Sequence, residues 1–116
     1  MKPVLVMFAS APWRGGRARD GLELALALLA FDHPLGVLFV EDGVQLLVPG
    51  QNPGPLGLAE VVRGLHALPH HGAAALVASA DCLRRRGITD TGLPVARLEA
   101  AALGQFIQGF GHVHCC

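Results

Sequence analysis

The sequence predicts one α/β domain, residues 1–116, with a mostly parallel sheet and helices on both of its faces. The first observation is an alternation, along the chain, of short continuous apolar runs with longer segments whose apolar residues have helical spacing. Continuously apolar strands are typical of parallel sheets that helices cover on both faces. The second observation is size, because 116 residues suffice for one hydrophobic core and are too few for two substantial ones.

Five apolar runs have the length and composition of strands. The runs at 3–9 and 35–40 contain almost no polar side chain, so both faces of these strands are expected to be buried. The expected strands are residues 3–9, 35–40, 74–78, 94–98 and 112–115.

Between these runs, apolar residues recur at positions i, i+3, i+4 and i+7, which is the spacing of one face of an α-helix. The first helix is expected to start at Arg17 and to stop before Pro34, and the second to end near Pro69. A short helix through 83–86 is expected to stop at Gly87. The apolar positions of the three longer helices are Leu22, Ala25, Leu26 and Leu29; Leu58, Val61, Val62 and Leu65; and Leu103, Phe106, Ile107 and Phe110.

The connections between these elements have the composition of turns. Residues 10–16 follow the first strand, and Glu41-Asp42-Gly43 follows the second. A stretch rich in proline and glycine at 49–55 predicts a long surface loop, and His70-His71-Gly72 predicts a turn into the third strand.

Charge is low and balanced, with nine basic and nine acidic side chains making up 16% of the chain. Without a net field, direct binding to nucleic acid or to an anionic membrane is not expected. No apolar run approaches the ~18 residues of a membrane span, and the first run is too short for a secretion signal. A small domain with 52% hydrophobic residues and few charges is expected to cover part of its surface with other subunits.

Cys82 is the candidate catalytic residue. Functional groups of parallel sheets collect at the carboxyl ends of the strands, here 10–16, 41–43 and 79–82. Cys82 falls in the first turn of the helix after the third strand, where the helix dipole, with Arg85 and Arg86, favours a thiolate. The alternative is that Cys82 is a small buried residue of the core.

The other two cysteines, Cys115 and Cys116, are neighbours at the end of the sequence. Adjacent cysteines are too close for an unstrained disulfide, and an odd total of three argues for reduced thiols in the cytoplasm. On a strand, His112, His114 and Cys116 point to one face, where they either hold zinc or face solvent. Known zinc spacings differ from this one, so no metal is assigned.

Two further patterns have an ordinary explanation beside a functional one. Glu41 and Asp42 suit acid/base chemistry, but an acidic pair before glycine is also common turn chemistry. Gly15-Gly16 opens a helix, as phosphate-binding loops do, yet neither G-x-G-x-x-G nor a P-loop lysine is present. No cofactor is therefore assigned, although the fold class suits a flavin- or nucleotide-binding module.

Several short segments, taken together, resemble one family. They are Ser10-Ala-Pro12, Ala18-Arg-Asp-Gly-Leu22, Ala30-Phe-Asp32, Pro34-Leu-Gly36, Leu38-Phe-Val40, Asp42-Gly-Val44, Pro49-Gly-Gln51 and Leu83-Arg-Arg-Arg-Gly-Ile88. Their order and spacing resemble the DsrE/DsrF-like sulfur-relay family, specifically its DsrF/TusC branch. The resemblance covers nearly the whole chain.

The resemblance implies a flavodoxin-like (DsrE-like) sheet of five mainly parallel strands. It also implies a subunit of a cytoplasmic heterohexamer with DsrE/TusD-like and DsrH/TusB-like partners, with a homo-oligomer as the alternative when the chain is alone. Such complexes pass persulfide sulfur either toward wobble-uridine 2-thiolation of tRNA or within dissimilatory sulfur oxidation.

The resemblance assigns the sulfur-carrying cysteine to the DsrE/TusD subunit, so this branch is expected to organise the complex. Where TusC-like chains place any cysteine of the third βα turn, this chain has Ser79, three residues before Cys82. A carrier role for Cys82, or for Cys115-Cys116, is the alternative.

Overall fold

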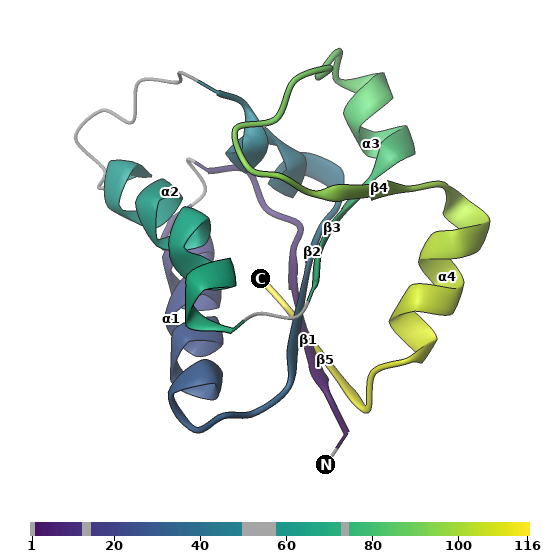
Figure 1. Cartoon of the computed structure of the whole chain (residues 1–116). Coiled ribbons are helices and arrows are strands. Elements are labelled where there is room, and N and C mark those ends of the chain that lie inside the picture. Colours follow the sequence, from purple (N-terminus) through teal and green to yellow (C-terminus); the bar gives the residue numbers. More distant parts are fainter. Residues whose placement is uncertain (1, 13–14, 50–57, 73–74) are drawn as a thin grey trace.

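The computed structural model describes residues 2–12, 15–49, 58–72 and 75–116. In these ranges the chain forms a parallel sheet of five strands in the order β4-β3-β2-β1-β5 (Figure 1). This arrangement confirms the predicted α/β class with a parallel sheet. The strands are β1 (Val4–Phe8), β2 (Leu35–Phe39), β3 (Ala75–Ser79), β4 (Ala96–Leu98) and β5 (His112–Cys115).

The most apolar strands occupy the interior of the sheet, as their sequences predict. β1 pairs with β2 from Val4 opposite Leu35 to Phe8 opposite Phe39. On its other side, β1 pairs with β5 from Val4 opposite His112 to Met7 opposite Cys115. All five residues of β2 are buried, whereas all four of β5 are exposed. The sheet therefore has a dry centre and a solvent-facing edge at β5.

One face of the sheet is covered by α1 (Arg17–Ala30) and α2 (Leu58–Ala67), which lie side by side (Figure 1). The main core lies here, with Phe8 and Phe39 stacked at 5.3 Å between ring centroids. Glycines on the helices allow this close packing. A Cβ on Gly64 of α2 would lie 2.4 Å from a methyl carbon of Leu22 in α1.

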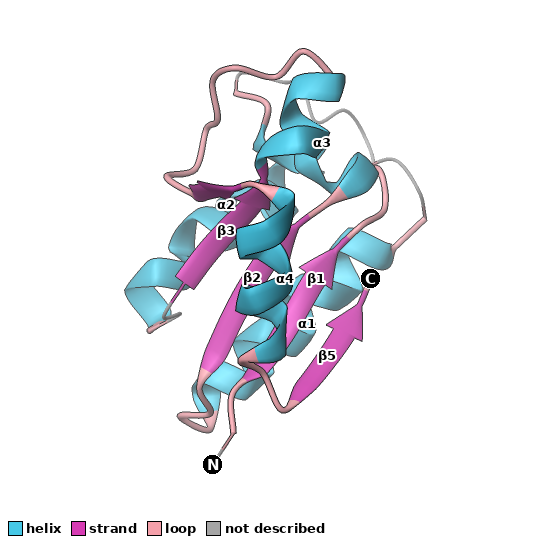
Figure 2. Cartoon of the chain, turned by 90° about the vertical axis from the view of Figure 1, so that its right-hand side faces the viewer, coloured by secondary structure: helices cyan, strands magenta, loops and turns pink. Residues whose placement is uncertain are grey.

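The opposite face is covered more thinly, by α4 (Ala100–Gln108), which crosses in front of the central strands in Figure 2. Its smaller cluster has only Leu5, Leu38 and Val77 as buried members. Of the nine residues of α4, all of them described, none is buried. Helices thus lie on both faces, as predicted, but only one face has a deep core.

Two local predictions at the ends of elements were wrong. Residues 41–43 were expected to form a simple turn, but a 3₁₀ helix, η1 (Glu41–Leu47), buries Val44, Leu46 and Leu47. The last helix ends at Gln108, and Phe110 lies beyond it. Phe110 nevertheless packs, because its ring fills the space over Gly36 in β2, where a Cβ would lie 2.4 Å away.

The remaining elements follow the prediction closely. The short helix is α3 (Ala80–Arg85), and α2 continues into a second 3₁₀ helix, η3 (Leu68–His71), that ends at Gly72 with a φ of 104°. The loop predicted at 49–55 lies outside the described residues from position 50 onward, as do positions 13–14 of the first turn and position 74 of the third strand. In the described ranges, no helix is both long and apolar enough to cross a membrane.

We expect Gly43→Ala to destabilise the protein, because a Cβ at this position would lie 1.9 Å from the carbonyl oxygen of Phe8. Overpacking against backbone costs about 1–3 kcal/mol, which urea denaturation would measure. The matched control is Gly104→Ala in α4, where a Cβ meets nothing within 4 Å. Replacing a helical glycine by alanine stabilises a protein by roughly 0.5–1 kcal/mol. The free energy of unfolding should therefore fall in Gly43→Ala and rise in Gly104→Ala. Equal stability of Gly43→Ala and wild type would contradict the close contact.

Candidate functional site

The candidate site lies at the carboxyl ends of β2 and β3, where η1 and α3 face each other. Cys82 is in the first turn of α3, as predicted, and its side chain is 4% exposed. Ser79 caps this helix, its Oγ accepting a hydrogen bond from the Cys82 N–H at 3.2 Å. An extended residue with a short hydroxyl side chain is a preferred N-cap, which explains why α3 begins here.

Glu41 contacts the Cys82 thiol in two ways. Its backbone N–H donates to Cys82 Sγ at 3.3 Å, and the thiol donates to Glu41 Oε1 at 3.7 Å. Glu41 reaches this position with a φ of 49°, in the left-handed region that non-glycine residues seldom adopt. The thiol is thus buried with both its donor and its acceptor capacity satisfied by one residue of η1.

Arg86 binds the two acidic side chains of η1, Asp42 and Glu41. Its Nε and Nη2 donate to Asp42 Oδ1 at 3.2 and 3.0 Å, and Nη2 lies 3.6 Å from Glu41 Oε2. Its Nη1 also donates to the Cys82 carbonyl at 3.4 Å. Arg86 therefore ties the two acidic residues of η1 to α3.

The arginines predicted to supply positive charge to the thiol are both engaged by carboxylates. Arg86 is bound by Asp42 and Glu41, as above. Arg85 donates to Asp81 Oδ2 at 2.6 Å, and this hydrogen bond raises the pKa of the Arg85 guanidinium above its usual value. The site therefore brings Cys82, Glu41 and Asp42 together, but pairs each cation with an anion.

The sequence did not reveal the Glu41–Cys82 contact or the Asp42–Arg86 pair. Each joins residues more than forty positions apart. Two features of the sequence could have indicated these contacts: the acidic pair that begins two residues after β2, and Arg86 at the end of α3. The carboxyl ends of neighbouring parallel strands meet at one edge of a sheet, so the segments that follow them lie close together.

The other two thiols lie at the carboxyl end of the outer strand β5, which β1 separates from β2 and the candidate site. All three cysteines of the chain are described and are free. Cys115 is exposed, whereas Cys116 is half-buried, with its Sγ against Gly21 of α1. Burial raises the pKa of the Cys116 thiol, and the neighbouring Cys115 and Asp20 raise it further.

The metal alternative for this edge is not supported. In the part of the chain that the structure describes, no three His, Cys, Asp or Glu side chains are placed to hold a metal ion. His112, His114 and Cys116 therefore do not form the cluster that their alternation suggested. The Cys116 carbonyl instead accepts hydrogen bonds from the Ala9 and Ser10 N–H groups at 2.9 and 3.2 Å, which extends the β1–β5 pairing.

The fold of this chain is shared with a protein of known structure. Over the full length of both chains, the structure superposes on the crystal structure of the YchN protein from Escherichia coli with a TM-score of 0.77. The two sequences are only 22% identical, so this comparison shows a shared fold.

The sequence then identifies the family. Residues 2–112 match the model of the DsrE/DsrF-like family, and the chain belongs to that family. It is 39% identical over 112 residues to the protein TusC homolog of Pseudomonas aeruginosa (strain PAO1), covering 95% of this chain and 94% of the relative. It is 35% identical over 88 residues to the protein TusC of Klebsiella pneumoniae (strain 342), covering 76% and 74%. These relatives place the chain in the DsrF/TusC branch.

The environments of the three thiols predict an order of reactivity in the native protein. With iodoacetamide near neutral pH, we expect Cys115 to react first, Cys116 more slowly because its raised pKa leaves less thiolate, and Cys82 last because it is buried. Peptide mapping by mass spectrometry at timed intervals measures the three rates. The rates should converge in urea. Native alkylation of Cys82 before Cys115 would show that the buried contact with Glu41 does not persist in solution.

Proposed function

We propose that this chain is the TusC-type subunit of a cytoplasmic sulfur-relay complex that supports wobble-uridine 2-thiolation of tRNA. We further propose that it organises the complex and does not itself carry sulfur. The observation that carries the first part is similarity to TusC proteins, over 95% of this chain in one relative and 76% in another. The proposed partners are DsrE/TusD-like and DsrH/TusB-like subunits, two copies of each of the three in a heterohexamer, with the 116 residues acting as one domain.

The environment of Cys82 supports the organising role. A carrier thiol must reach the persulfide of a donor protein and then an acceptor thiol. Cys82 is 4% exposed and is held by Glu41, whose carboxylate would stand beside any negative charge on the sulfur. Ser79 occupies the turn position where this branch would place a cysteine, and its hydroxyl caps α3.

The surface supports an assembly. Phe31 is 84% exposed at the end of α1, and Val113 is 39% exposed on the edge strand β5. The half-buried apolar residues of α4, including Phe106 and Ile107, cover the thin face of the sheet without being covered themselves. Apolar area left in water at an edge strand and on a helix face is typical of subunits that pack against others.

Co-expression tests the assembly directly. We expect a tagged copy of this chain to co-purify with both sister subunits from the same genome, and native mass spectrometry to give a complex with equal copies of the three. Expression of the chain alone is the control, and gives the oligomeric state without partners. Recovery of the tagged chain as a monomer, with neither sister subunit bound, would contradict the proposed function.

Persulfide transfer tests the organising role against the carrier alternative. In that alternative the Cys82 thiolate attacks the outer sulfur of a donor persulfide, forming Cys82-S-SH and releasing the donor thiolate. We expect intact-mass analysis after incubation with a cysteine desulfurase and cysteine to show no added sulfur on Cys82. We also expect Cys82→Ser to support wild-type 2-thiouridine levels in cells that lack the chromosomal copy.

The matched control is the cysteine of the DsrE/TusD-like sister subunit, whose replacement by serine should abolish the modified nucleoside. A reductant-labile sulfur on Cys82, together with loss of thiolation in Cys82→Ser, would establish this chain as a carrier.

A further inference from the structure

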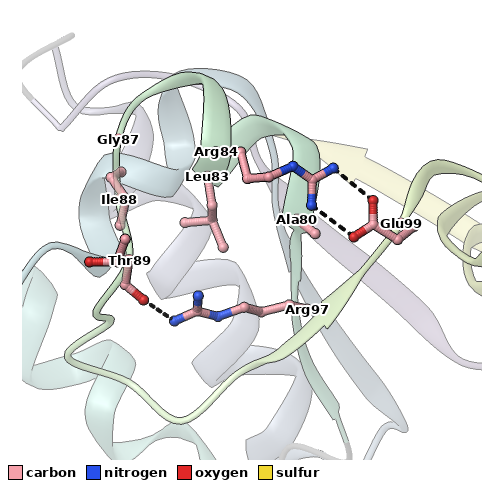
Figure 3. A pocket seen from close by; sticks show the side chains of 8 residues that line it. All are labelled: Ala80, Leu83, Arg84, Gly87, Ile88, Thr89, Arg97 and Glu99. Carbon is pink, nitrogen blue, oxygen red and sulfur yellow. Dashed lines mark hydrogen bonds and ion pairs between the residues drawn. The ribbon is translucent and has the colours of Figure 1, made fainter.

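A cavity of about 510 Å³ opens beside the edge strand β4, between α3 and the segment that follows it (Figure 3). Its apolar wall comes from the first and last turns of α3 and the residue after Gly87. Its polar wall comes from Arg84 of α3, Arg97 of β4 and Glu99, which directly precedes α4. The main lining residues are Ala80, Leu83, Ile88, Arg84, Arg97 and Glu99.

The charges in this cavity do not balance. Arg84 donates two hydrogen bonds to the carboxylate of Glu99, at 2.9 and 2.8 Å, and this pair lowers the pKa of Glu99. Arg97 extends from β4 toward the other end of the cavity and donates to the carbonyl of Thr89 (Figure 3). Among the described residues, no carboxylate pairs with Arg97. The lining thus contains two guanidinium groups and one carboxylate, and because that carboxylate binds Arg84, the charge of Arg97 is left for an incoming anion.

We propose that this cavity receives an aspartate or glutamate side chain from a partner subunit, with its carboxylate on Arg97. Arg97 uses one of its five N–H donors on Thr89, so its planar fork retains donors for a second, charge-assisted contact. Leu83 and Ile88 supply apolar contact for the stem of the incoming side chain. The inference rests on the proposed function, because the partner is taken to be a sister subunit of the same complex.

The surroundings favour a protein over a free carboxylate. In the part of the chain that the structure describes, β4 pairs with β3 and no strand lies along its outer edge, where Ala96 and Arg97 are exposed. The uncovered helix α4 follows directly after Glu99. A cavity of this volume is far larger than one acidic side chain, since such volumes hold whole small ligands of roughly 300–1,000 Å³. A partner that inserts an acid here would also cover the edge strand.

The test compares Arg97→Glu with Arg63→Glu in co-expressed, purified complexes. Arg63 is an exposed arginine on α2, on the opposite face of the sheet, so its reversal changes the net charge equally. Losing a charge-assisted contact and adding a like charge should weaken affinity for one sister subunit roughly tenfold to hundredfold. Arg63→Glu should bind as wild type does, and Arg97→Gln should fall between them. Circular dichroism and thermal melting of each variant alone verify folding.

The outcomes separate the two proposals. If the wild-type chain binds neither sister subunit, the proposed function fails. If the wild-type chain binds both and Arg97→Glu binds equally well, the proposed function stands and the acidic anchor is wrong.

A photo-crosslinking residue at Thr89, which is exposed at the rim of the cavity, identifies the occupant. We expect a crosslink to one sister subunit next to an aspartate or glutamate. Replacing that acid by arginine should restore binding to Arg97→Glu. A crosslink to a second copy of this chain, or to a segment without an acidic residue, would overturn the proposal.

Discussion

The close approach of η1 to the end of β1 determines the geometry of the whole carboxyl edge. Gly43 lies so near the Phe8 carbonyl that only a hydrogen atom fits between them. The Val40 N–H also donates to that carbonyl at 3.0 Å, so β2 is anchored to β1 directly before the chain turns. The turn then requires a left-handed Glu41, and this conformation directs the Glu41 backbone N–H at the Cys82 sulfur.

The same close approach explains why Cys82, the candidate catalytic thiol, is buried and bound by Glu41. η1 lies over the end of the sheet, and its two acidic residues meet α3, where Glu41 contacts Cys82 and Asp42 binds Arg86. Cys82 and Arg86 thus connect the second and third strand–helix units at the edge where parallel sheets usually hold ligands. The burial of Cys82 and its contacts with Glu41 support the proposal that this thiol does not carry sulfur.

The sequence was most informative where local composition and tertiary packing agree. Continuous apolar runs predicted β1 and β2 because those strands are largely buried, and the run at 112–115 predicted β5, all of whose residues are exposed. It was least informative about η1, since a 3₁₀ segment has no α-helical periodicity and Glu-Asp-Gly is ordinary turn chemistry. Cys82 was placed correctly in the first turn of α3, but its partner was not predictable. That partner depends on Gly43 meeting a carbonyl from another strand.

The two faces of the sheet differ in a way that connects fold to assembly. On the α1/α2 face, glycines at helix contacts bring large side chains together, and residues from both helices are fully buried. On the α4 face, every helix residue keeps contact with solvent, although the helix is mostly apolar. The cavity at Arg97 opens beside the outer edge of β4, along which no strand lies among the residues with a described structure. The apolar surface of α4 is unfavourable in water, and Arg97 has no carboxylate partner within the described ranges. One protein partner that carries an acidic side chain would therefore cover the helix and pair with Arg97 at a single surface.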